Sequence, residues 1–243
     1  LYVANYSGGS LSVFKTFEGR ISPISQLIQY TGSSVNPSRQ KEPHAHMTIL
    51  SPDQNYLYVN DLGTDKIYQH KIFADGTVEE KYTATTVPVG QGPRHLIFNK
   101  AGSHAYLITE LKGQVDVFKA TDNQLNLVQT LDADTAKSPD KGSADIHLSP
   151  NEKWLISSNR ISSNELTIFA VQADGLLKKI KHQTVARKPR NFNFDPTGHF
   201  VFVASQDVSF ASMSNSEIEH IFNQVVDKNA NNSFVFQKKL IGE

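Results

Sequence analysis

The chain has 243 residues, enough for one large domain with a substantial core, and it contains no cysteine that would form disulfides or thiolate zinc sites. Its 24 lysine and arginine residues balance its 24 aspartate and glutamate residues, which argues against a broad nucleic-acid surface. No apolar run reaches the roughly 20 residues that a membrane-spanning helix needs, so we expect no membrane partner and a cytoplasmic location.

The N-terminal residues LYVANYSGG (1–9) have the pattern of a strand followed by a turn. We therefore expect the sequence to start within a structural repeat and to be incomplete at its N-terminus. A polar stretch, Thr31–Lys41, follows before the next apolar run, and it predicts a surface loop.

From residue 46 onward, one phrase recurs at intervals in the forties, with copies starting at His46, His95, Ala144 and Arg190. Each copy divides into short apolar segments separated by Gly, Asn and Asp. In the second copy the expected strands are 95–98, 104–110, 114–120 and 125–131. A repeat of this length, made of four strands, is typical of a β-propeller blade. The fold class predicted is all-β, a propeller of four-stranded antiparallel blades.

The pattern changes near the C-terminus. Residues 214–226 have helical spacing, and Ser216 stands three residues before Glu219 as in a capping box. We expect a helix-like insertion around 208–230. About five blades' worth of sequence is present, and we treat 1–243 as a single propeller domain that is part of a larger ring.

Topology predicts where unusual side chains gather. In a four-stranded meander, the start of the first strand and the end of the second lie on the same face of the blade. His46 and Arg94 stand at first-strand starts, and Glu110 and Arg160 at second-strand ends. These four residues are predicted to converge at one mouth of the central channel, where loops on a rigid scaffold usually carry binding chemistry. In our alignment of the copies Arg94, Glu110 and Arg160 each occur only once, as expected of a site.

Structural roles are the competing interpretation for several residues. His95 and His147, at strand starts, are typical of hydrogen-bonding corners, and Arg190 is also expected to be structural in the first instance. Arg94 is alternatively a clamp on backbone carbonyls, and Glu110 simply the partner of an arginine. His44 with His46 forms an H-x-H pair, but no further ligands accompany it, so we expect no metal.

Five segments, in order, resemble the seven-bladed β-propeller lactonase family, which includes bacterial 6-phosphogluconolactonases and fungal carboxymuconate-cyclising enzymes. The segments are ANYSGGSLSVF (4–14), PHAHMTILSPDQNYLYVNDLGTDKI (43–67), GQGPRHLIFNKAGSHAYLITEL (90–111), SADIHLSPNEKWLISSNR (143–160) and KPRNFNFDPTGHFVFVASQD (188–207). The resemblance implies a seven-bladed ring. It also implies a catalytic set of His46, Arg94, Glu110 and Arg160.

The resemblance further implies hydrolysis of an anionic sugar δ-lactone, 6-phosphoglucono-1,5-lactone, without metal or cofactor. One arginine would hold the anionic group and the other the developing oxyanion. Either His46 or Glu110 would take the proton from water, and His46 is favoured. We assign substrate contacts to His44, His95 and Arg190.

Two other functions stay open. One is lactonising cycloisomerisation of a muconate-type dicarboxylate, which uses similar anion-binding groups. The other is a non-catalytic propeller that binds a protein, since fold does not fix function. A calcium-dependent lactonase would need a carboxylate and amide cluster, for which Asp61 and Asn159 are the candidates. The expected partner is a small anionic lactone, and we assume a monomer.

Overall fold

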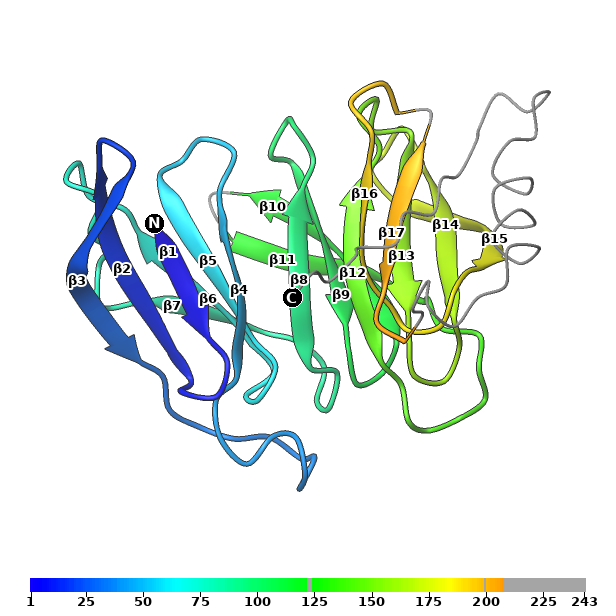
Figure 1. The fold of residues 1–243 in the computed structure, drawn as a ribbon, viewed down its shortest axis with the longest axis horizontal. Coiled ribbons are helices and arrows are strands. Elements are labelled where there is room, and N and C mark those ends of the chain that lie inside the picture. The colour runs from blue at the N-terminus through cyan, green and yellow to red at the C-terminus, as the bar shows by residue number, and fades with distance from the viewer. Residues whose placement is uncertain (122–123, 199, 208–243) are drawn as a thin grey trace. The chain divides into compact units, whose positions relative to one another are not determined.

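The computed structural model describes residues 1–121, 124–198 and 200–207. Within these residues every regular element is a β-strand, and all strand pairing is antiparallel (Figure 1). The chain divides into two compact units, residues 1–131 and 132–243. The predicted helix-like insertion around 208–230 lies outside the described residues.

Unit 1 contains three sheets, each a meander of sequential strands (Figure 1). The first has three strands: β1 (Tyr2–Asn5), β2 (Ser10–Phe17) and β3 (Arg20–Gln29). The second has four: β4 (Ala45–Leu50), β5 (Tyr56–Asp61), β6 (Lys66–Lys71) and β7 (Thr83–Thr86). The third also has four: β8 (Pro93–Phe98), β9 (His104–Thr109), β10 (Gln114–Thr121) and β11 (Gln124–Asp132), the last ending at the unit boundary.

Unit 2 repeats the pattern. Its first sheet has four strands: β12 (Ser143–Leu148), β13 (Trp154–Asn159), β14 (Glu165–Val171) and β15 (Leu177–Thr184). The second described sheet consists of β16 (Pro189–Phe194) and β17 (Val201–Ser205). The strands predicted for the second repeat copy agree with β8–β11 to within two residues at each end. The predicted fold class, all-β with four-stranded antiparallel blades, is confirmed.

Burial follows strand position within a sheet. The second strands β5, β9 and β13 are almost wholly buried, whereas the fourth strands β11 and β15 are mostly exposed. Apolar side chains of neighbouring sheets pack together, as Leu11 and Val13 of β2 do against Leu57 and Val59 of β5. Strands covered on both faces read as continuous apolar runs, which is why the repeats were visible in the sequence.

The turn between the first and second strands is built in the same way in all four repeat copies. The residue directly after the first strand accepts a hydrogen bond from a backbone N–H at the start of the second strand or one residue before it. The four acceptors are Ser51, Asn99, Ser149 and Asp195, at 3.0, 3.0, 3.0 and 2.8 Å. These acceptors fix the structural equivalence of the copies.

That equivalence corrects our alignment of the repeats by one residue. The alignment matched His46 with His95, because both are histidines at strand starts. In the structure Ala45 is opposite Asp61 and Pro93 is opposite Thr109. His46 therefore corresponds to Arg94. By the same register Glu110, which follows Thr109, corresponds to Leu62 and Arg160 rather than to Asp61 and Asn159.

The first strand of each of the four repeat copies carries a β-bulge directly after its first residue. These strands are β4, β8, β12 and β16. In β4 the extra residue is His46, in β8 it is Arg94, and in β16 it is Arg190. In β12 the bulge falls between Ser143 and Ile146. A bulge leaves one residue outside the ladder and re-aims its side chain. The chemically distinctive residues of the repeat therefore stand where the regular pairing is interrupted.

Candidate functional site

An ion pair between Arg94 and Glu110 forms the centre of the site in unit 1. Arg94 Nε donates to Glu110 Oε2 at 2.8 Å, and the two residues are only 2% and 3% exposed. The backbone N–H of Glu110 donates to Gly92 O at 2.9 Å, which fixes the carboxylate beside the bulge. The expectation that Glu110 pairs with an arginine is confirmed. Removing one partner would leave the other charge buried, so the pair is rigidly specified.

The loop before Arg94 is held by a buried carboxylate. Asp65 Oδ2 accepts from the backbone N–H of Gly90 at 2.7 Å, and Asp65 Oδ1 from that of Gly92 at 2.8 Å. Gly92 has φ of +67°, and a Cβ there would lie 2.7 Å from Leu111 Cγ. Only glycine fits this position without strain. The GQGPR loop (90–94) therefore fixes the position of Arg94.

A second guanidinium reaches Glu110 from the loop that we expected to be a plain surface loop. Arg39 Nη2 donates to Glu110 Oε1 at 2.7 Å and to the hydroxyl of Tyr6 at 3.2 Å. Both carboxylate oxygens of Glu110 thus accept hydrogen bonds from arginines. Sequence reasoning missed Arg39 and Tyr6, because neither lies in the repeated phrase; a lone arginine in a Ser- and Asn-rich stretch was the available signal.

His46 lies between two other rings. Its ring centroid is 5.6 Å from that of Tyr6 and 5.2 Å from that of His95, both in edge-on geometry. Its Nδ1 is buried and has no hydrogen-bond partner among the described residues. Burial, followed by the charges of Arg94 and His95, lowers the pKa of His46 to about 3. His46 is therefore a neutral imidazole at pH 7.

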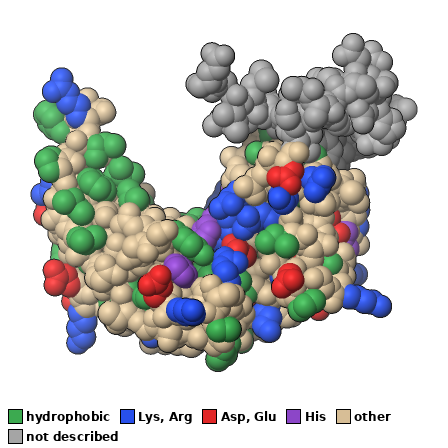
Figure 2. Space-filling view, turned by 60° about the horizontal axis from the view of Figure 1, so that its bottom comes forward, with side chains coloured by type: hydrophobic (Ala, Val, Ile, Leu, Met, Phe, Trp, Pro, Cys, Tyr) green, Lys and Arg blue, Asp and Glu red, His purple; other side chains and the backbone are tan. Residues whose placement is uncertain are grey.

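The other two predicted histidines belong to the same cluster. His95 Nε2 lies 3.3 Å from Arg94 Nη1. The ring of His44 stacks on Tyr6 with centroids 4.6 Å apart, and its Nδ1 lies 3.1 Å from Tyr6 O. All three histidines are half-buried, and histidine side chains reach the surface in the space-filling view (Figure 2). Unit 1 thus brings together five predicted residues: His44, His46, Arg94, His95 and Glu110.

The remaining two predicted residues, Arg160 and Arg190, belong to unit 2, so their convergence with the others stays a prediction. Arg160 follows β13 and is half-buried, and its backbone N–H donates to Gly142 O at 3.3 Å. Arg190 is exposed and occupies the bulge of β16.

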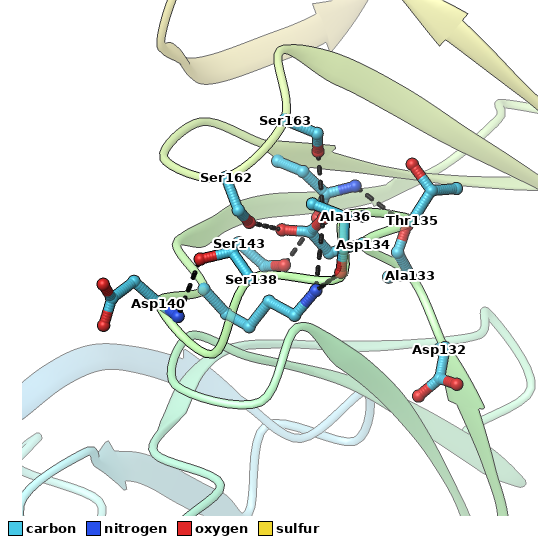
Figure 3. Close-up of polar contacts among 12 residues, drawn as sticks. Asp132, Ala133, Asp134, Thr135, Ala136, Ser138, Asp140, Ser143, Ser162 and Ser163 are labelled. Carbon is cyan, nitrogen blue, oxygen red and sulfur yellow. Dashed lines mark hydrogen bonds and ion pairs between the residues drawn. The ribbon is translucent and has the colours of Figure 1, made fainter.

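A polar network anchors the segment just after Arg160 (Figure 3). Asp134 Oδ2 accepts from the hydroxyl of Ser162, and Asp134 Oδ1 accepts from that of Ser163 at 3.1 Å and from the N–H of Ala136 at 2.9 Å. Lys141 Nζ lies 3.6 Å from the same carboxylate. Asp134 therefore ties the segment before β12 to the loop that carries Arg160, as Asp65 does for the loop before Arg94.

His147 has the structural role that we expected of it. Its Nε2 lies 3.1 Å from Asp145 Oδ2, and its ring packs edge-on against Phe192 with centroids 5.0 Å apart. The same Asp145 oxygen accepts from Asn191 Nδ2 at 2.5 Å and from Phe192 N at 3.2 Å. This corner joins β12 to β16.

Among the described residues, no group of three or more histidine, aspartate or glutamate side chains gathers in a geometry that would hold a metal ion. Asp61, a candidate calcium ligand, is occupied instead: its Oδ1 accepts from His44 N at 2.6 Å and its Oδ2 from Thr64 Oγ1 at 2.7 Å. In the same part of the chain, no helix has the length and apolar character to cross a bilayer.

Comparisons with known proteins show which family this fold belongs to. The family model described as "Lactonase, 7-bladed beta-propeller" matches residues 1–216. The chain is 37% identical over 213 residues to a 6-phosphogluconolactonase of Formosa agariphila, a match that covers 85% of this chain and 60% of that protein.

Two solved structures are similar over the same region. A candidate 6-phosphogluconolactonase from Bacteroides fragilis is 42% identical with a TM-score of 0.79. The periplasmic gluconolactonase PpgL of Pseudomonas aeruginosa is 35% identical with a TM-score of 0.77. Each match covers 85% of this chain and 60% of the other. The chain spans about 60% of the length of these relatives.

Proposed function

Because the chain belongs to the family of seven-bladed β-propeller lactonases, we propose that the full-length protein hydrolyses 6-phosphoglucono-1,5-lactone to 6-phosphogluconate. The similarity to proteins named 6-phosphogluconolactonase supports this substrate. The observation that carries the proposal is the buried Arg94–Glu110 pair beside a neutral, half-buried His46. It combines a fixed cation with a group able to accept a proton.

His46 is the base in this proposal. As water oxygen bonds to the lactone carbonyl carbon, its proton passes to the imidazole, and the carbonyl oxygen becomes an oxyanion. The tetrahedral intermediate then collapses: the bond from carbon to the ring oxygen breaks, and the imidazolium returns the proton to that oxygen. The net change is the addition of one water. Glu110 is not the base, because both its oxygens already accept from arginines.

The low pKa of His46 keeps the imidazole neutral but weakens it as a base. Burial is the largest cause of this low pKa and the charge of Arg94 comes second, and an anionic substrate bound near Arg94 would offset part of that charge. Substrate binding therefore raises the pKa of His46 toward its ordinary value of about 6.5 and strengthens the base when it is needed. A kinetic consequence is that the acid limb of kcat lies at higher pH than that of kcat/KM.

Arg160 of unit 2 is a further member of the proposed catalytic set. The motif SNR (158–160), on which the resemblance to the family partly rests, supports this assignment. Two of the four predicted catalytic residues are arginines. Because Arg94 is already engaged with Glu110, Arg160 is the one that would stabilise the oxyanion. His44, His95 and Arg190 are proposed substrate contacts.

We further propose that the reaction needs no metal and takes place in the cytoplasm. The arginines supply the positive charge that a metal would otherwise bring to the oxyanion. A phosphorylated lactone does not cross membranes unaided, so a cytoplasmic substrate calls for a cytoplasmic enzyme. Activity that persists in a chelator, and enzyme recovered in the cytosolic fraction, are the expected outcomes. Loss of activity in chelator that is restored by a divalent metal would contradict the first.

The test is a lactone-opening assay on the full-length protein, with His46→Ala as the inactive comparison. We expect rapid opening of 6-phosphoglucono-1,5-lactone by the wild type and a loss of about 10²–10⁴-fold in the variant. Parallel incubation with a carboxymuconate substrate distinguishes cycloisomerisation. Absence of any opening above the spontaneous rate would refute the proposal and favour a non-catalytic propeller.

A further inference from the structure

Arg39 is the arginine of the unit 1 cluster that a ligand can reach. Its side chain is 35% exposed, whereas that of Arg94 is 2% exposed. A phosphate group needs direct contact with guanidinium N–H groups, which a buried arginine offers only after rearrangement. Arg39 therefore differs from Arg94 in function, although both contact Glu110.

The guanidinium of Arg39 is oriented and still has donors to spare. Its printed contacts, to Glu110 Oε1 and the Tyr6 hydroxyl, both use Nη2. Its Nη1 and Nε make no hydrogen bond to the described residues. These two nitrogens carry three N–H groups that can each donate to a phosphate oxygen.

The loop around Arg39 is anchored at several points. Asn36 Oδ1 accepts from the backbone N–H groups of Ser38 and Arg39, each at 3.1 Å. Gln40 is completely buried, and its Nε2 donates to Leu62 O at 2.9 Å. Ser34 Oγ donates to Asp65 Oδ2 at 2.5 Å, the carboxylate that also holds Gly90 and Gly92. The loop is thus built to place Arg39, and the anchor at Asp65 is shared with the loop that places Arg94.

We propose that Arg39 binds the phosphate group of the phosphorylated sugar lactone, with the Tyr6 hydroxyl beside it, and so sets the preference for phosphorylated over unphosphorylated lactones. The proposal rests on the function proposed above. It divides the work between the two arginines: Arg94 holds Glu110 inside the protein, and Arg39 presents the ligand with an oriented positive charge. Glu110 preorganises both.

The test compares two substrates, 6-phosphoglucono-1,5-lactone and glucono-1,5-lactone, which differ only in the phosphate. Steady-state kcat and KM are measured for the full-length wild type, Arg39→Ala, Arg39→Gln and Arg39→Lys. Arg20→Ala serves as the matched control, because Arg20 is an exposed arginine at the start of β3 in the same unit. Inhibition by 6-phosphogluconate reports phosphate binding independently of turnover.

In Arg39→Ala we expect the KM for the phosphorylated lactone and the inhibition constant of 6-phosphogluconate to rise about 10- to 100-fold, the loss typical of a charge-assisted contact. The ratio of kcat/KM values for the two lactones falls by the same factor. Arg39→Lys recovers part of the loss, since it restores the charge without the fork. Arg20→Ala leaves the ratio at the wild-type value.

Equal losses on both lactones in Arg39→Ala, with an unchanged ratio, would show that Arg39 only supports the fold. Should that variant fail to fold, Arg39→Gln, which keeps a hydrogen-bond donor toward Glu110, decides by the same ratio. A wild-type ratio retained in folded Arg39→Gln overturns the proposal. Failure of the proposed function is seen separately, as a wild type that opens neither lactone.

Discussion

The bulges of the two units have the same geometry but different chemistry. In unit 1 the bulges of β4 and β8 present His46 and Arg94, which lie in one cluster with Glu110. In unit 2 the bulge of β12 includes Asp145, whose carboxylate contacts Ile146 N, His147, Asn191 and Phe192 N of its own unit. The bulge of β16 presents the exposed Arg190. The same backbone feature therefore serves a candidate site in one unit and a structural corner in the other.

The difference lies in how the hydrogen-bonding capacity of each residue is used. Asp145 is nearly saturated by the side chains and backbone of β12 and β16. His46, in contrast, keeps a buried Nδ1 without a partner among the described residues. Buried polar groups are normally satisfied, and exceptions are a mark of functional sites. The bulge determines where the side chain lies, and a buried polar atom without a hydrogen-bond partner indicates function.

The largest expected effect is on the rate of lactone opening, and it should differ between the bulge of β4 and that of β16. His46→Ala should reduce lactone opening by about 10²–10⁴-fold, because it removes the proposed base. Arg190→Ala, the equivalent position in unit 2, should change the rate far less, as it alters at most one proposed substrate contact. Initial rates at saturating lactone, with circular dichroism to confirm folding, measure both. Similar rates in the two variants would remove the distinction between the units.

The next effect concerns stability. Glu110→Ala leaves Arg94 buried without the carboxylate that holds its Nε, and we expect a loss of about 3–5 kcal/mol in the free energy of unfolding. Urea denaturation measures it. The double variant Glu110→Leu with Arg94→Met should lose much less, because it removes both charges together. A Glu110→Ala protein as stable as the wild type would contradict the buried pair.

Asp145→Ala in unit 2 should lower the free energy of unfolding by less than Glu110→Ala does. It leaves the backbone N–H of Phe192 and the side chain of Asn191 without their acceptor, and unsatisfied donors of this kind cost about 1–3 kcal/mol. The same urea measurement applies. Lactone opening per folded molecule should stay close to wild type if the corner is only structural, and a hundredfold loss would instead assign Asp145 to the site.

The smallest effect is the dependence of stability on pH. The pKa of His46 is lowered to about 3 in the folded state, so between pH 7 and pH 5 the unfolded chain takes up a proton that the folded chain does not. Stability is therefore lost as pH falls. The pKa of His70 is also lowered, chiefly by burial, and acts with the same sign.

The His46 contribution is isolated by comparison with His46→Asn. We expect the wild type to lose about 1 kcal/mol more than the variant between pH 7 and pH 5, after allowance for partial exposure of the ring. Urea unfolding at the two pH values gives the difference. Identical losses would show that His46 has an ordinary pKa in the folded protein.

Much of the architecture was accessible from the sequence. Apolar alternation and turn residues predicted the strands β8–β11 closely, and meander topology predicted that His46, Arg94 and Glu110 lie on one face. These predictions succeed because they depend on local periodicity. The one-residue error in the repeat alignment arose where periodicity is interrupted, since a bulge shifts register without leaving a sequence signal as strong as a shared histidine.

By itself, then, the sequence determined the strand pattern, the fold class and the family, because all three depend on short segments that repeat along the chain. Only the tertiary structure decided which residues meet: the bulges at His46 and Arg94, and the arrival of Arg39 and Tyr6 at Glu110. Arg39 and Glu110 are far apart in the chain, and their contact depends on the anchored loop 31–41. Contacts of that kind follow from packing and hydrogen bonding in three dimensions, which local patterns do not encode.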